Sequence, residues 1–147
     1  NSKLETRNSK LETRNSKLET RNSKLETQQG GCMQYEKLEI WLRSRNLSID
    51  VYRELTDLRD FGFKDQITRS ALSVPSNIAE GMERSSQLEK ARFLVISKGS
   101  IGEFKTQADI GVAIGYINQQ KGSSWMQEAE QLSKMLGSFI NRLKNHG

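Results

Sequence analysis

Two acidic residues are the strongest candidates for catalysis in this sequence. Glu80 lies in the polar run of residues 73–81, and Glu103 lies in the helical pattern that follows. Paired carboxylates can divide the roles of general acid and general base, so a small metal-dependent hydrolase or nuclease stays open. The alternative is structural, because Asn77 and Glu80 lie one helical turn apart just after Pro75. There they can satisfy backbone groups that the proline disturbs.

The sequence offers few other groups for catalysis or metal binding. Cys32 is the single cysteine and His146 is the single histidine. An internal disulfide and a multi-histidine metal site are therefore impossible, and a Cys–His nucleophile or a Ser–His–Asp triad is close to excluded. Di-iron enzymes built on helix bundles need Glu-x-x-His units, and the sequence contains none. We therefore expect no cofactor, no metal and no catalytic residue, and the sequence favours a non-enzymatic protein.

Nucleic-acid binding is the second kind of chemistry to consider, because the formal net charge is +5. Residues 1–27 hold four Lys, three Arg and four Glu, a net +3, so only +2 is left for residues 28–147. A binding surface needs clustered cations on the folded part. Seven cations on or beside the predicted helices are candidates: Arg43, Arg45, Arg53, Arg69, Arg84, Lys98 and Lys105. The alternative is a solvated surface of mixed charge.

Four helices must position these side chains. Apolar residues recur at three- and four-residue steps, which draws an apolar stripe along one side of a helix. Segments with this spacing lie near residues 35–58, 64–81, 86–117 and 124–145. Short connections make successive helices neighbours, so the sequence predicts an all-α, antiparallel up-down four-helix bundle.

Local signals mark where these helices begin, bend and end. Ser86 and Glu89 have the spacing of a capping box, which predicts the start of the third helix. Pro75 removes a backbone donor and should kink or restart the second helix. Residues 121–124 should form the turn before the fourth helix. Glycines inside the third helix, such as Gly99, should allow close helix packing, because each one weakens the helix by up to about 1 kcal/mol.

Residues 1–32 are expected to form a separate extension in front of a domain of residues 33–147. The heptad Asn-Ser-Lys-Leu-Glu-Thr-Arg repeats without substitution through residue 27. One leucine per heptad is too few for a coiled-coil seam, so we predict a mobile or weakly helical tail. The sequence contains no apolar run long enough for a membrane span and no apolar core of a secretory signal. We therefore expect a cytoplasmic protein with no membrane partner.

The third predicted helix carries a second apolar face. If Leu94 and Ile101 face the core, then Phe93, Phe104 and Ile114 point outward. Exposed apolar faces usually mark interfaces, so this face predicts a homo-oligomer. A ring would cover the face in every subunit, because a contact repeated by rotation closes on itself. The alternative is that this helix is simply the most buried of the four.

Residues 73–81 and 93–103 carry a family resemblance, which extends over about residues 33–145. The chain resembles the four-helix-bundle proteins first recognised in 23S ribosomal RNA intervening sequences. The motif residues are Pro75, Asn77, Glu80, Gly81, Gly99 and Glu103. The resemblance implies a ring-shaped homopentamer. The family includes accessory variability proteins of diversity-generating retroelements, so it also implies RNA or DNA and a reverse transcriptase as partners.

Charge is the main departure from those accessory proteins, which are strongly basic, whereas residues 28–147 carry only +2 here. The affinity of a protein for nucleic acid depends on the number of phosphates that it neutralises. Taken together, the sequence and the resemblance predict a non-enzymatic, oligomeric adaptor or scaffold that engages structured RNA, DNA or a nucleic-acid enzyme.

Overall fold

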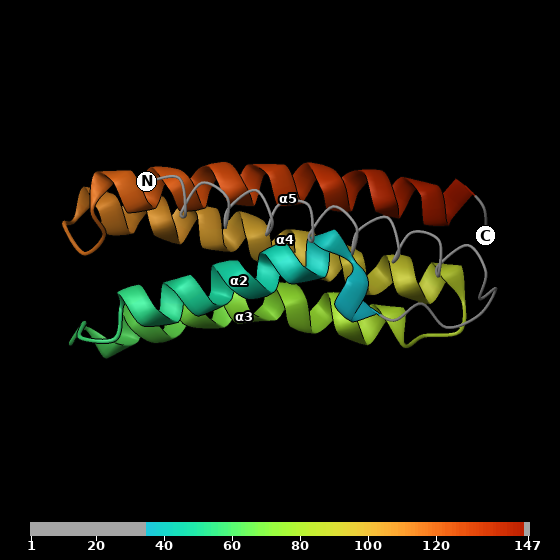
Figure 1. Cartoon of the computed structure of the whole chain (residues 1–147), viewed down its shortest axis with the longest axis horizontal. Helices are drawn as coiled ribbons and strands as arrows, with labels where there is room; N and C mark the ends of the chain where they lie inside the picture. The colour runs from blue at the N-terminus through green and yellow to red at the C-terminus, as the bar shows by residue number, and fades with distance from the viewer. Residues whose placement is uncertain (1–34, 146–147) are drawn as a thin grey trace, which may run out of the picture. The chain divides into compact units, whose positions relative to one another are not determined.

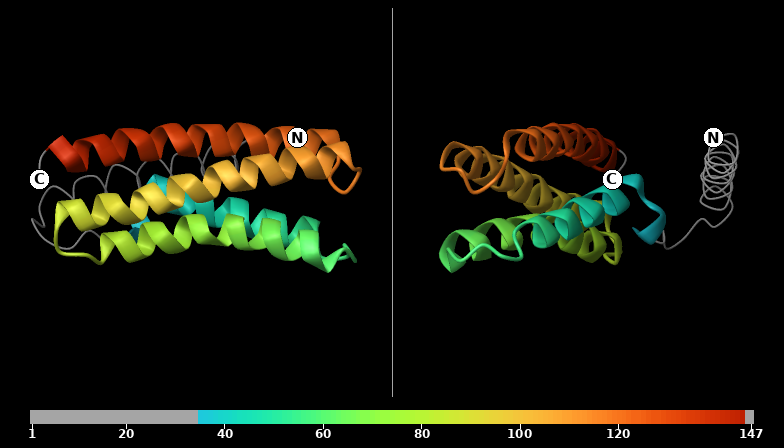
Figure 2. Two further views of the ribbon diagram at one scale, coloured as in Figure 1. Left: turned by 180° about the vertical axis from the view of Figure 1, so that it is seen from behind. Right: turned by 60° about the vertical axis from the view of Figure 1, so that its left-hand side comes forward.

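The computed structural model describes residues 35–145 and shows four long antiparallel helices (Figure 1). A short 3-10 helix, η1 (Tyr35–Lys37), precedes α2 (Glu39–Glu54), α3 (Phe61–Met82), α4 (Gln87–Ala113) and α5 (Gln119–Asn145). Successive helices pack side by side, and α5 returns to α2 to complete the up-down bundle (Figure 2). The predicted all-α fold is confirmed. The predicted extension, residues 1–32, lies outside the described residues.

The core is one apolar cluster to which all four helices contribute. Its largest fully buried side chains are Val51, Leu55, Ile67, Val74, Ile78, Met82, Leu94, Ile101, Phe104, Trp125, Leu132 and Leu136. Because α4 packs extensively on both α3 and α5, it is the central helix of the bundle. None of the helices in residues 35–145 combines the length and the apolar character that a membrane span requires.

Polar side chains define the helix starts. The Ser86 side chain accepts a hydrogen bond from the amide of Glu89 at 3.1 Å, so the predicted start of the third helix is confirmed. Asp60 caps α3 in the same way, through the amide of Phe63 at 3.1 Å. Its carboxylate also accepts a bond from the Tyr116 hydroxyl at 2.8 Å, and these two bonds lower the pKa of Asp60. One carboxylate therefore connects the start of α3 to the segment that follows α4.

Three predicted boundaries are wrong. The third helix was expected to reach about residue 117, but α4 ends at Ala113. The first helix does not run continuously over residues 35–58, because η1 and Leu38 precede α2, which ends at Glu54. Residues 121–124 are not a turn, since they belong to α5. Asn118 caps this helix, because its side chain accepts a bond from the amide of Lys121 at 2.7 Å. Gly122 is buried where a Cβ atom would collide with Val112, so this glycine permits close packing and does not mark a turn.

Candidate functional site

Pro75 lies in the middle of α3, yet the helix continues from Phe61 to Met82. The prediction that it restarts the helix is therefore wrong. Ser97 of α4 donates a hydrogen bond to the carbonyl of Val74 at 2.9 Å, directly beside the proline. This buried hydroxyl joins α4 to α3 beside the proline, although the carbonyl that loses its helical donor at Pro75 is that of Ala71, four residues earlier.

The polar residues around Pro75 form a seam between α3 and α4. The hydroxyl oxygens of Ser73 and Ser100 are 2.8 Å apart. Asn77 donates from its side-chain amide to the carbonyl of Ser73 at 2.8 Å and to its hydroxyl at 2.9 Å. Further along the seam, Ser70 donates to Gln107 at 2.6 Å. Asn77 therefore has a structural role, in a seam that satisfies its own polar groups, whereas Glu80 pairs with Arg84 and makes no bond to the backbone near Pro75.

Gly81 allows a close approach between α3 and α4. A Cβ atom on this glycine would lie 2.9 Å from the Cβ of Phe93 and 3.2 Å from the carbonyl oxygen of Lys90. Real Cβ atoms essentially never come within 3.0 Å of such neighbours, so any side chain here would push the helices apart. The glycine at the end of the motif is explained by packing.

The structure does not bring Glu80 and Glu103 together. From the contact between Ser73 and Ser100, Glu80 lies seven residues toward the α3–α4 connection and Glu103 lies three residues away from it. At 1.5 Å per residue the backbone positions of the two glutamates are about 15 Å apart along the helix axes. Carboxylates that share acid and base roles lie within about 10 Å. The structure therefore gives no support to the paired-carboxylate hypothesis.

The same end of α3 borders an open groove that sequence reasoning did not predict. Its volume is about 470 Å³, and its lining residues are Tyr35, Ser76, Ala79, Glu80, Glu83 and Arg84. Arg84 pairs with Glu80 at 2.6 Å, and its guanidinium carbon lies 4.7 Å from the centre of the Phe93 ring. Two of the charged groups in the groove therefore neutralise each other.

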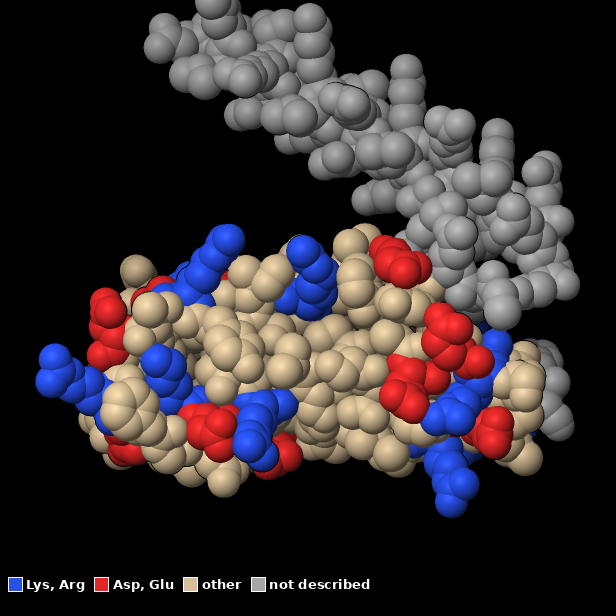
Figure 3. Space-filling model, turned by 90° about the horizontal axis from the view of Figure 1, so that it is seen from below, with Lys and Arg blue, Asp and Glu red and all other residues tan. Residues whose placement is uncertain are grey.

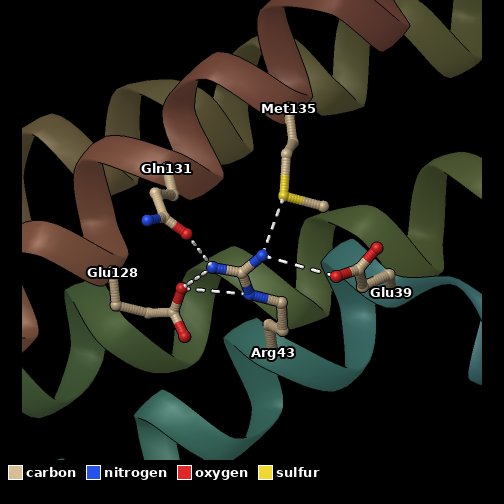
Figure 4. A network of polar contacts seen from close by, with 5 residues as sticks. All are labelled: Glu39, Arg43, Glu128, Gln131 and Met135. Atoms are coloured by element: carbon tan, nitrogen blue, oxygen red, sulfur yellow. Dashed lines mark hydrogen bonds and ion pairs between the residues drawn. The ribbon is translucent and has the colours of Figure 1, made fainter.

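The guanidinium of Arg43 bonds to side chains of the neighbouring helix α5. Its Nε donates to Glu128 at 3.0 Å, and a second bond to the same carboxylate raises the pKa of Arg43. Figure 4 shows further contacts with Gln131, Glu39 and Met135, so the side chain ties α2 to α5. These contacts take Arg43 out of the group of cations open to phosphate.

The seven candidate cations do not form one isolated positive cluster. They lie on α2, α3, α4 and the connection between α3 and α4, and Arg43, Arg69 and Arg84 are each paired with a carboxylate. Arg45, Arg53, Lys98 and Lys105 are exposed and form no ion pair within residues 35–145. Figure 3 shows basic and acidic side chains intermixed toward both ends of one face, with a largely uncharged middle. The charged parts of this face therefore carry both signs.

Asp50 is a structural residue that the sequence reasoning missed. Its carboxylate accepts a hydrogen bond from the buried Trp125 indole at 2.7 Å and another from Lys121 at 3.2 Å. Burial raises the pKa of Asp50. The hydrogen bonds from Trp125 and Lys121, together with the charges of Lys121 and Arg53, outweigh burial and hold the pKa below its ordinary 3.8. The only signal in the sequence is an acidic residue beside an apolar stripe.

This contact predicts a component of stability that depends on pH. A carboxylate whose pKa is lower in the folded chain stabilises it above the unfolded pKa, and the contribution is lost as the pH falls through the folded pKa. We expect Asp50→Asn to be less stable than wild type at pH 7 and to lose less stability between about pH 5 and pH 3. Thermal unfolding across this range measures the difference. Asp57→Asn, at an exposed position, is the matched control, and an equal acid loss in Asp50→Asn and wild type would contradict the assignment.

The predicted outward position of Phe104 is wrong. Phe104 is only 1% exposed, and its ring centroid lies 6.1 Å from that of Trp125. The reason is that α4 is covered by both α3 and α5, so its inner face is wider than one narrow stripe. Phe93 is half-buried beneath Arg84, whereas Ile114 is 53% exposed as predicted.

A second apolar face nevertheless exists on α4, formed mainly by other residues. This outer face of α4 consists of Leu88, Val95, Ile96, Gly99, Gly102, Ile110 and the adjoining Ile114, all exposed. A Cβ atom on Gly99 or Gly102 would meet nothing within 4 Å. The prediction that Gly99 serves close packing is therefore wrong within the single chain.

Comparisons with known proteins agree with this architecture. The model of a family described as 23S rRNA-intervening sequence protein matches residues 36–138. A solved structure from Bacteroides thetaiotaomicron VPI-5482, a protein of unknown function from the S23 ribosomal protein family, has a TM-score of 0.65 and 22% sequence identity. The match covers 69% of this chain and 97% of that chain, and it shows a shared fold. No curated protein matches the chain.

Proposed function

This chain belongs to the family of 23S rRNA-intervening sequence proteins, and from that premise we propose that it is a non-enzymatic, oligomeric scaffold for structured nucleic acid. The outer face of α4 is the observation that carries the proposal. Its leucine, valine and isoleucines are 47–66% exposed. Apolar patches of this kind mark interaction surfaces, because leaving them in water opposes the hydrophobic effect.

Self-association is the part of the proposal that this face supports. The core of the bundle is complete without these residues, since Leu94, Ile101 and Phe104 fill the inner side of α4. A contact between copies would remove the outer face from water. The homopentamer that the resemblance implies stays a prediction, and light scattering on the full chain at micromolar concentration measures the subunit number. A monomer would contradict the proposed oligomer.

Nucleic acid is the ligand that the family description suggests, and the open cations supply the chemistry. Arg45 and Arg53 lie on α2, while Lys98 and Lys105 lie on α4, all exposed. Few cations per chain give weak binding, because affinity depends on the number of phosphates neutralised. An oligomer multiplies these contacts on one ligand and so raises the overall affinity. A reverse transcriptase as protein partner rests on the resemblance alone.

Charge reversal on α2 tests nucleic-acid binding. We expect full-length Arg45→Glu/Arg53→Glu to bind a fluorescent RNA hairpin more weakly than wild type. We also expect the slope of log affinity against log salt to fall by about 1 for each phosphate that the variant no longer neutralises. Fluorescence anisotropy at several salt concentrations measures both quantities. Lys134→Glu/Lys144→Glu is the matched control, because it reverses the same number of exposed cations on α5. Equal weakening in both variants would point to general charge attraction, and unchanged binding in both would contradict a role for α2.

A further inference from the structure

The open groove at the C-terminal end of α3 has the size of a small-ligand site. Its volume of about 470 Å³ lies within the range of about 300–1,000 Å³ that ligand pockets occupy. Its wall combines a tyrosine of η1 with residues of α3 and of the connection to α4. The side chains with polar groups are Tyr35, Ser76, Glu80, Glu83 and Arg84. An aromatic ring, a guanidinium and two carboxylates therefore line one open space.

Tyr35 and Arg84 give this groove two flat surfaces that are already held in place. The Tyr35 ring meets Trp41 edge-on, with the ring centroids 5.5 Å apart. The guanidinium of Arg84 lies over the Phe93 ring and pairs with Glu80, yet its side chain is still 41% exposed. Unpaired bases of nucleic acids stack on aromatic rings and on guanidinium planes. The groove thus offers preformed stacking surfaces.

The carboxylate of Glu83 has no visible use within the fold. Glu83 is the C-terminal cap residue of α3, where the helix dipole disfavours a negative charge. Its side chain forms no ion pair and no hydrogen bond within residues 35–145. The charge of Glu36 is the main cause that raises the pKa of Tyr35, and burial and the charge of Glu83 add to it. Glu83 therefore lies near the Tyr35 ring with its hydrogen-bonding capacity unused.

Guanine is the base whose donors match a carboxylate. A carboxylate only accepts hydrogen bonds, and its two oxygens can take two parallel N–H groups. The N1–H and the N2 amino group of guanine point side by side along the Watson–Crick edge. Adenine and cytosine present one amino group next to a ring acceptor, and uracil would bring two carbonyl oxygens toward the negative charge. The chemistry of the groove therefore favours guanine over the other three bases.

We infer that this groove takes one unpaired guanine base of a nucleic acid, stacked on Tyr35 and Arg84 and bonded along its Watson–Crick edge to Glu83. The inference rests on the proposed binding of structured nucleic acid and names the part that is read. Contacts to phosphate position a nucleic acid, whereas contacts to base edges specify it. The groove and the exposed cations thus have separate roles.

Glu83→Gln in the full chain tests the base contact, because charge alone predicts the opposite result. Removing a negative charge should strengthen the attraction to phosphates. We expect instead that Glu83→Gln binds a fluorescent RNA hairpin with a single guanine in a uridine loop about tenfold more weakly than wild type, the usual effect of losing a bidentate base contact. Fluorescence anisotropy measures both affinities. Glu103→Gln removes the same charge from an exposed position on α4 and should bind no more weakly than wild type.

Changes in the RNA test the same contact from the side of the ligand. Inosine lacks the N2 amino group, so wild type should bind an inosine hairpin about tenfold more weakly than the guanine hairpin. Glu83→Gln should discriminate less between the two. A loop with uridine alone should bind wild type most weakly. Free guanosine in excess, with uridine as its control, tests whether the base binds without the strand.

Two tyrosine variants test stacking. Tyr35→Ala should weaken binding of the guanine hairpin by about tenfold, because stacking of a base on an aromatic ring contributes strongly to affinity. Tyr35→Phe keeps the ring and should bind like wild type. Thermal unfolding separates folding from binding. Glu83→Gln should be at least as stable as wild type, since it removes charge from the unfavourable end of α3.

The outcomes distinguish this inference from the proposed function. A guanine preference in wild type that is lost in Glu83→Gln and in Tyr35→Ala supports the base site. Equal binding of the guanine, inosine and uridine hairpins by wild type overturns the inference and leaves the proposed nucleic-acid binding standing. Tighter binding of every hairpin by Glu83→Gln also overturns it, because Glu83 would then act by charge repulsion alone.

Two further outcomes concern the source of the base. Binding of free guanosine without any preference among the hairpins would make a free nucleoside the ligand and overturn the assignment to a nucleic acid. A full chain that binds none of the hairpins overturns the proposed scaffold for nucleic acid and this inference with it.

Discussion

Phe104→Ala is expected to lower the free energy of unfolding by about 3–5 kcal/mol, the usual cost of truncating a buried phenylalanine. Phe104 is 1% exposed and packs against Trp125 in the centre of the bundle. The central helix contributes this ring to a core that α3 and α5 close from two sides, so neighbouring groups cannot easily fill the cavity. A loss of this size is a large fraction of the roughly 5–15 kcal/mol by which native proteins are stable.

Denaturant unfolding followed by circular dichroism measures this loss. Phe61→Ala is the matched control, because Phe61 is 71% exposed at the start of α3 and its removal should change stability by less than about 0.5 kcal/mol. Measurements at two protein concentrations separate folding from self-association. A Phe104→Ala chain with unchanged stability and weakened assembly would place this ring at an interface, in conflict with the structure.

Alanine at two glycines of the same bundle should have opposite effects. Gly81→Ala should destabilise the fold by about 1–3 kcal/mol, because overpacking forces backbone shifts. The new methyl would lie 2.9 Å from the Cβ of Phe93, an atom that cannot move without the helix. Gly99→Ala should stabilise the single chain by up to about 1 kcal/mol, since alanine favours the helix and the space around this position is open.

The comparison is sharp because the substitution is identical and both glycines lie within helices. Thermal unfolding of dilute protein reports the single chain, and the midpoints should move in opposite directions. If Gly81→Ala were as stable as wild type, the close approach of α3 to α4 would be wrong. If Gly99→Ala lost stability only at high concentration, the loss would belong to the proposed self-association.

The fold could be predicted because, in each of α2, α3 and α5, the spacing of the apolar residues marks a single side of the helix as the buried one. In α5 the buried residues Trp125, Ala129, Leu132 and Leu136 follow steps of four and three. The ends were harder to predict, because residues with high turn propensity can also serve packing. Gly122 looked like part of a turn, although it lies inside α5 where Val112 leaves no room for a side chain.

The sequence of α4 did not show which side of the helix faces the core. The apolar residues of α4 are spread around its whole circumference, while two of its buried residues, Ser97 and Ser100, are polar. These serines are buried because they bond to Val74 and Ser73 of α3, a reason that appears only when the two helices are placed together. Sequence spacing thus predicted apolar residues on two sides of α4, but of the three residues assigned to the outer side, Phe93, Phe104 and Ile114, only Ile114 is exposed.

The distance between Glu80 and Glu103 illustrates the same limit for the candidate site. Both residues belong to the motif and both carry a carboxylate, so the sequence suggested a pair. Their separation depends on which residue of α3 faces which residue of α4. The contact of Ser73 with Ser100 fixes that register, and it places the two carboxylates at different levels of the bundle.

The edge between α2 and α5 differs in kind from the rest of the bundle. α2 has 16 residues against 27 in α5, and the polar groups of Arg43 and Asp50 provide much of what joins the two helices. Side-chain ties of this sort are few and directional, and water can replace them one at a time. Local opening of a protein begins where little apolar area is lost. We therefore expect local opening of the bundle to begin at this edge. The frequency with which water reaches Trp125 will depend on the contacts of Arg43 with Glu128 and of Asp50 with Trp125.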